Sequence, residues 1–169
     1  VGIDFVTPKG GRPPVDGACP TDPINGGYRA GGEAPRLCSR AFTPAEVDAS
    51  DSAAGDLAVG NGTMWDFPDN ATLADLAWRV YEKGGVVAAL CHGVSGLVNV
   101  RLANGKHLVE GRTVSSYTND EEELAGVTKV VPFLLETKLI ERGAVHKKSP
   151  PRQAHVEVDG RLVTGQNPA

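Results

Sequence analysis

Residues 84–96 read Gly84-Gly85-Val86-Val87-Ala88-Ala89-Leu90-Cys91-His92-Gly93-Val94-Ser95-Gly96, and this stretch decides the fold. Its continuous apolar run is typical of a central strand in a parallel sheet. A Cys-His pair follows, and then small residues that suit the start of a helix. A nucleophile at the tip of such a strand-to-helix turn forms a nucleophile elbow. We expect the turn to push the Cys91 side chain out of the sheet, near the positive end of the next helix, where the thiolate is favoured.

Strand and helix patterns alternate on both sides of this stretch. Strands are predicted at 1–6, 56–59 and 113–117, and alternating residues around Asp159-Gly160 predict a hairpin over 153–164. Helical spacing and end signals predict helices over 70–83, 95–100, 118–123 and 130–142, with a short helical turn at 43–47. This alternation predicts an α/β domain with a mostly parallel sheet.

Composition narrows the classes of function. The 169 residues are 40% hydrophobic and 22% charged, which predicts a single globular domain over 1–169 with an irregular Gly/Pro-rich segment at 11–45. A net charge of −4 without a basic run argues against nucleic-acid binding, and no apolar run is long enough to span a membrane. Cys19, Cys38 and Cys91 lack metal-ligand spacing, so we expect no metal site and a cytoplasmic location; a Cys19–Cys38 disulfide is less favoured than two free thiols.

Cys91 and His92 are the candidate catalytic residues. Cys91 suits nucleophilic attack on an aldehyde or thioester carbonyl, and the alternative is a buried structural cysteine. His92 suits proton transfer near neutral pH, and the alternative is a residue that contributes only its backbone N–H. One of the carboxylates at 120–123 is a candidate to orient His92, but local sequence does not say which.

The Gly60-Asn61-Gly62 segment follows a predicted strand. Its backbone N–H groups are candidates for an oxyanion hole that would also bind substrate. The alternative is a tight loop without a catalytic role.

Four segments together resemble a known family: the elbow at 88–93 and the stretches 62–69, 117–122 and 159–168. They are similar to the glutathione-independent glyoxalase (glyoxalase III) and heat-shock chaperone branch of the DJ-one/PfpI superfamily, which is class I glutamine amidotransferase-like. The likeness runs from about residue 60 to the end and over 1–11. It implies a flavodoxin-like three-layer sandwich with a mostly parallel central sheet.

The resemblance also implies an activity, the conversion of methylglyoxal to lactate without glutathione or another cofactor. Cys91 would form a hemithioacetal with this small dicarbonyl substrate, and His92 or a nearby carboxylate would move a proton between its carbons. Glu122 matches the acidic triad position of the family, while Gly60 and the backbone N–H of His92 would stabilise the oxyanion. Protein deglycase activity, holding-chaperone activity and a homodimer are further implications.

The chain also departs from the family pattern. The family has a strand and helix before the segment at Val1, including a glutamate beside the cysteine, and a further helix after Pro168. We therefore expect the chain to be truncated at both ends. Val59 stands where the family has glycine, which weakens the oxyanion prediction. The alternatives to a glyoxalase are a stress chaperone or redox sensor and, less favoured, a cysteine amidase or peptidase with its histidine on another strand.

Overall fold

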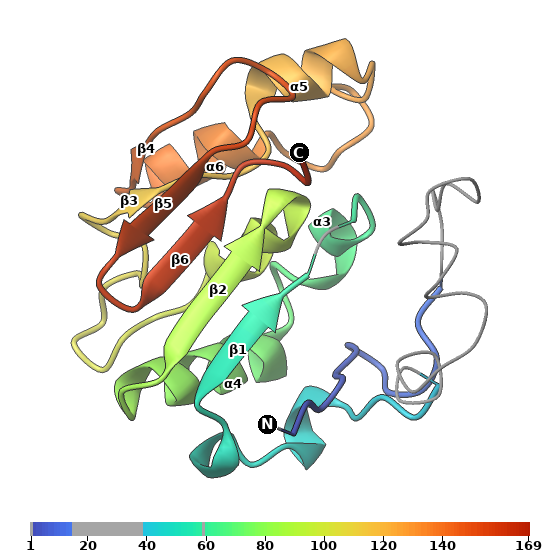
Figure 1. Ribbon diagram of the computed structural model, residues 1–169, viewed down its shortest axis with the longest axis vertical. Helices are drawn as coiled ribbons and strands as arrows, with labels where there is room; N and C mark the ends of the chain where they lie inside the picture. Colours follow the sequence, from blue (N-terminus) through green and yellow to red (C-terminus); the bar gives the residue numbers. More distant parts are fainter. Residues whose placement is uncertain (1, 15–38, 59) are drawn as a thin grey trace. The chain divides into compact units, whose positions relative to one another are not determined.

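The computed structural model describes residues 2–14, 39–58 and 60–169, and it divides into two compact units, Val1–Val47 and Asp48–Ala169 (Figure 1). Cys19, Cys38 and Val59 lie outside the described residues, so the interpretations of these three positions stay predictions. The single domain over 1–169 likewise stays a prediction.

In the first unit, the prediction of a strand at 1–6 is wrong for the residues of this range that the structure describes. Val6 makes an isolated parallel bridge with Phe42, because the backbone hydrogen bonds of 5–7 reach only that one residue. The helical turn predicted at 43–47 is confirmed as the 3-10 helix η1 (Pro44–Glu46), which Thr43 and Glu46 close with a capping box.

The second unit is built on a four-stranded sheet in the order β1-β2-β6-β5. Its strands are β1 (Ala54–Leu57), β2 (Val86–Leu90), β5 (Val156–Asp159) and β6 (Leu162–Gly165). β2 pairs in parallel with β1 and β6, whereas β5 and β6 form the hairpin predicted around Asp159-Gly160. β3 (Thr113–Val114) and β4 (Val145–His146) form a separate parallel pair. This mixed, mostly parallel sheet with helices confirms the predicted α/β fold.

Helices connect these strands as the end signals predict. Their bounds are η2 (Ala49–Asp51), α3 (Thr63–Asp66), α4 (Ala71–Glu82), η3 (Cys91–Leu97), α5 (Asn119–Leu124) and α6 (Leu135–Glu141). The Asn70 side chain caps α4 by accepting from the Leu73 N–H, and Thr118 caps α5 in a reciprocal bond with Glu121. The helices predicted at 70–83 and 118–123 are therefore confirmed.

Four predicted boundaries are wrong. β1 begins two residues before the predicted 56–59. The strand predicted at 113–117 ends at Val114, since the Ser115 N–H donates to the Thr164 hydroxyl instead of a strand partner. The helix predicted at 95–100 is the 3-10 helix η3, which begins at Cys91 itself. The helix predicted at 130–142 begins only at Leu135, because Pro132 disfavours helical geometry in the residue before it.

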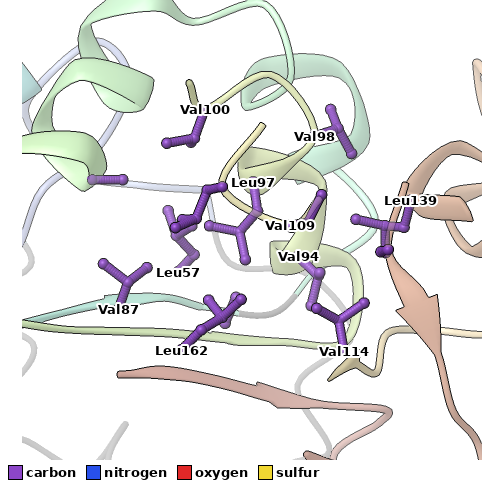
Figure 2. Close-up of a cluster of buried hydrophobic side chains, with 14 of the residues drawn as sticks. Leu57, Val87, Val94, Leu97, Val98, Val100, Val109, Val114, Leu139 and Leu162 are labelled. Atoms are coloured by element: carbon purple, nitrogen blue, oxygen red, sulfur yellow. The ribbon is translucent and has the colours of Figure 1, made fainter. Parts of the chain in front are cut away.

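The core lies on one face of the sheet, where β2 and β6 pack against α4, η3 and α6 (Figure 2). Val87 and Leu162 point into it from adjacent strands, and Val94, Leu97 and Leu139 meet them from the helices. On the opposite face Val86, Val156 and Val158 are exposed. Burial of so many apolar side chains around η3 fixes the turn that carries Cys91 against the carboxyl end of β2.

Within the described residues, no helix has both the length and the apolar character that crossing a membrane requires.

Candidate active site

Cys91 lies at a strained turn between β2 and η3. Its φ of 58° falls in the left-handed region, which a residue with a side chain adopts at an energetic cost. Gly93 allows the turn to approach β1, because a Cβ at this position would lie 2.2 Å from the Leu57 carbonyl oxygen and 2.4 Å from that of Ala58. The chain therefore has the strand-turn-helix geometry of a nucleophile elbow, with a 3-10 helix in place of an α-helix.

Cys91, His92 and Glu122 form one hydrogen-bonded chain. The Cys91 Sγ lies 3.5 Å from the His92 Nδ1, and the His92 Nε2 lies 2.8 Å from the Glu122 Oε1. The His92 and Glu122 side chains are 2% and 0% exposed. When the His92 Nε2–H donates to the carboxylate, Nδ1 carries the lone pair and faces the thiol as an acceptor. This tautomer makes His92 a base for the Cys91 proton.

Tyr117 supports this arrangement from the loop before α5. Its ring packs against the His92 ring with 4.3 Å between centroids, and its backbone N–H donates to the Cys91 carbonyl at 3.5 Å. Burial, and next the neighbouring Cys91, raise the pKa of the Tyr117 hydroxyl above its ordinary value. Tyr117 therefore presents a neutral hydroxyl to the site near neutral pH.

The pKa of Cys91 lies above its ordinary value, which runs against the expectation that the turn favours the thiolate. Burial is the largest effect on the pKa of Cys91 and raises it; a hydrogen bond from the His92 backbone lowers it, the negative charges of Glu121 and Glu122 raise it, and the net value is about 11. Cys91 is only 6% exposed, and the cost of burying a thiolate outweighs the N–H that the first turn of η3 donates to it.

A pocket of about 430 Å³ opens onto Cys91 and His92. It is large enough for a small-molecule substrate. Its lining consists of Asn61, Cys91, His92, Tyr117, Glu121, Arg152, Asn167, Pro168 and Ala169.

The three residues of the predicted oxyanion loop do not share one position relative to the pocket. Asn61 lines the pocket, whereas Gly60 and Gly62 are outside its lining. The Gly60 carbonyl accepts from the Thr63 N–H and hydroxyl, and Gly62 is the N-cap of α3. Their role in oxyanion stabilisation stays a prediction.

Glu121 lines the pocket, and the sequence did not predict this position for it. Its Oε1 accepts from the Arg152 N–H at 2.9 Å and the Asn167 amide at 2.7 Å, and its Oε2 accepts from the Thr118 N–H and hydroxyl at 3.0 and 2.9 Å. Burial raises the pKa of Glu121, but these hydrogen bonds more than offset it and hold the pKa below its ordinary value. The Thr118-x-x-Glu121 spacing is a sequence signal for a capping box. No sequence signal predicts the contacts of Glu121 with Arg152 and Asn167, which lie in distant loops.

His146 and His155 bond to residues other than Cys91. The His146 Nε2 lies 3.0 Å from the Ser116 hydroxyl, and His155 bonds to Ser149 and Glu157. The histidine at the sulfur is the adjacent His92, which argues against an amidase or peptidase with its base on another strand. Across the ranges that the structure covers, no cluster of three His, Cys, Asp or Glu side chains could hold a metal.

Comparisons with known proteins agree with the family resemblance, although no protein-family model matches the chain. The probable glutathione-independent glyoxalase SNO4 of Saccharomyces cerevisiae is 30% identical over 179 residues, which cover 98% of this chain and 74% of that protein. This chain belongs to the glutathione-independent glyoxalase family.

A second relative supports this family assignment, and a solved structure supports the fold. The glutathione-independent glyoxalase HSP31 of the same yeast is 36% identical over 135 residues, 75% of this chain and 56% of the relative. The X-ray structure of the Francisella tularensis Rapid Encystment Protein 24 KDa superposes with a TM-score of 0.92 at 36% identity, covering 98% of this chain and 74% of that one. The chain thus spans about half to three quarters of the length of these relatives.

Proposed function

We propose that this protein is a glutathione-independent glyoxalase that converts methylglyoxal and water to lactate. The observation that carries the proposal is the Cys91–His92–Glu122 hydrogen-bonded chain at the floor of an open pocket. The names of its relatives support the same activity. The pocket holds about 430 Å³, which is enough room for a three-carbon dicarbonyl.

The first step forms a hemithioacetal. His92 Nδ1 takes the thiol proton as the Cys91 sulfur attacks the aldehyde carbon, and the electrons of the C=O bond move to oxygen. The imidazolium then returns the proton to that oxygen. Backbone N–H groups of His92 and of the Gly60-Asn61-Gly62 loop are the proposed donors to the developing oxyanion.

The second step moves a proton between the two carbons. Neutral His92 removes the hydrogen of the former aldehyde carbon, and the electrons pass through an enediol to the neighbouring carbonyl oxygen. The same imidazolium protonates the second carbon, which leaves a lactoyl thioester on Cys91. Water then attacks the thioester carbonyl, the carbon–sulfur bond breaks, and Cys91 recovers its proton.

Glu122 acts through His92 and touches no substrate. It fixes the tautomer in which Nδ1 accepts, and it stabilises the imidazolium that appears in each proton transfer. A buried position without a water contact strengthens that stabilisation, since the local dielectric is low.

Lactate formation from methylglyoxal in the absence of glutathione tests the proposal. We expect D-lactate from the full chain and none above background from Cys91→Ala, with Lys129→Gln, an exposed position outside the pocket, as the matched control. Equal rates for the wild type and Cys91→Ala would end the proposal.

We also propose that the protein acts in the cytoplasm as a homodimer on small dicarbonyls, with deglycase activity as a secondary use of the same sulfur. The cysteine pattern supports the location, and family membership supports the dimer. Light scattering during size exclusion would test the dimer. The raised pKa of Cys91 argues against a redox sensor, because sensor cysteines are low-pKa thiols.

A further inference from the structure

The pocket contains a second strained residue, Arg152. Cys91 and Arg152 are the two non-glycine residues with positive φ in the part of the chain that the structure describes, at 58° and 63°, and both line this pocket. Strain of this kind persists where surrounding contacts impose it, and it concentrates at functional sites. At Arg152 the imposing contact is the bond from its backbone N–H to the buried Glu121 carboxylate.

The hydrogen bonds of Glu121 leave the Arg152 guanidinium without a counterion. Both carboxylate oxygens of Glu121 are already occupied by four donors, and the one from Arg152 is its backbone N–H. Among the described residues, the guanidinium itself has no hydrogen-bond or ion-pair partner. It lies close enough to Tyr117 to lower the pKa of that hydroxyl against the larger effect of burial. A positively charged residue of the pocket lining therefore has its side-chain donors available.

The volume of the pocket indicates the size of substrate that could contact the Arg152 guanidinium. Methylglyoxal has five non-hydrogen atoms and fills about 150 Å³ if each is given roughly the volume of a water molecule. The pocket holds about 430 Å³, so a three-carbon dicarbonyl leaves most of it empty. Arg152 is an exposed residue of the lining, whereas Cys91 is only 6% exposed, so a substrate whose aldehyde reaches Cys91 would present its remote end toward Arg152.

We propose that Arg152 is a specificity-determining residue that selects 2-oxoaldehydes carrying an anionic group at the end remote from the aldehyde. A guanidinium binds a carboxylate through two parallel N–H donors, which also fixes the orientation of the substrate chain. The aldehyde is then directed to Cys91 while the acid end stays at the rim. This inference rests on the proposed glyoxalase function for its chemistry, but the anion site is testable separately.

The kinetic test uses a matched pair of substrates, 4,5-dioxopentanoate and its neutral methyl ester, with methylglyoxal as reference. In the wild type we expect kcat/KM for the acid to exceed that for the ester by about tenfold, the lower range for a hydrogen bond to a charged group at an exposed site. Arg152→Gln should bring the ratio near one, and Arg152→Lys should keep part of the preference. Lys129→Gln, which removes an equal charge elsewhere, should leave the ratio unchanged.

A binding measurement separates failure of this inference from failure of the proposed function. Levulinate carries the acid end but no aldehyde, so its binding, followed by NMR or calorimetry, does not depend on turnover. We expect it to bind the wild type and Cys91→Ala, and to bind Arg152→Gln at least about tenfold more weakly. No binding to the wild type, or equal binding to Arg152→Gln, overturns the inference even if methylglyoxal is converted. Arg152-dependent binding without conversion of methylglyoxal supports the anion site and overturns only the glyoxalase proposal.

Discussion

Replacing Glu122 by glutamine tests the proposed base most directly, because it changes one oxygen of a fully buried side chain to an amide. The carboxylate accepts from His92 Nε2 at 2.8 Å through Oε1, while Oε2 is buried and has no hydrogen-bond partner among the described residues. Glutamine keeps the shape but can donate to Nε2 as well as accept from it. When it donates, the imidazole proton sits on Nδ1, which then faces Cys91 as a donor and cannot take the thiol proton.

The expected loss of activity is large and the expected change in stability is small and favourable. General base catalysis contributes roughly 10²–10⁴-fold, so Glu122→Gln should lower kcat/KM at least about 100-fold, or about 2.7 kcal/mol in the barrier. A neutral amide costs less to bury than a carboxylate with one unpaired oxygen. The free energy of unfolding should therefore rise by about 1 kcal/mol.

The neighbouring Glu121→Gln is the matched control, since it makes the same chemical change one residue away. Either placement of the new amide nitrogen faces two donors, so two of four hydrogen bonds are lost. We expect the free energy of unfolding to fall by about 2–4 kcal/mol. Urea unfolding and lactate formation are measured for both variants. The reasoning is refuted if Glu122→Gln keeps activity within threefold of wild type, or if both variants lose stability equally.

Three other predictions concern the turn and the pocket. Alkylation of Cys91 by iodoacetamide, followed by mass spectrometry, should accelerate about tenfold per pH unit from pH 7 to 10, because burial holds its pKa at about 11; a plateau below pH 8 would contradict this. Gly93→Ala should lower the free energy of unfolding in urea by about 2–3 kcal/mol or more and abolish activity, because its Cβ would meet two backbone carbonyls. Gly96→Ala is the control and should lower it less, because its Cβ would meet only side chains, at 3.2 Å or beyond. The hydrogen bonds that lower the pKa of Glu121 stabilise the folded state above about pH 4.5, and this stabilisation is lost as the pH falls through the lowered pKa of Glu121. Unfolding curves taken from pH 7 to 3 should show this loss in the wild type and not in Glu121→Gln.

Several local signals gave correct predictions where the determining interactions were also local. The capping side chain of Asn70, the apolar run of β2 and the Asp159-Gly160 turn each act within a few residues, and each predicted its element correctly. Predictions failed where a distant partner decides. The strand expected to continue past Val114 ends because Ser115 bonds to Thr164, 49 positions away in the chain.

The candidate site shows the same division. Cys91 and His92 are adjacent in the chain, so a single motif identified them together with the turn that presents them. Which of four consecutive carboxylates faces His92 could not be derived from spacing alone, and family resemblance was needed to favour Glu122. The pKa of Cys91 was predicted in the wrong direction, because the motif shows the helix that follows but not the burial or the two carboxylates that α5 brings near it.

The amino-acid sequence by itself determined the α/β alternation, the strand-turn-helix stretch and the candidate pair of Cys91 and His92, because these depend on contacts a few residues apart. Only the tertiary structure decided the protonation of that sulfur, the four-donor environment of Glu121 and the position of Arg152 at the pocket. Those properties depend on burial and on charges from α5, the loop before β5 and the last residues of the chain. Such segments approach one another only when the sheet and its helices pack around a common core.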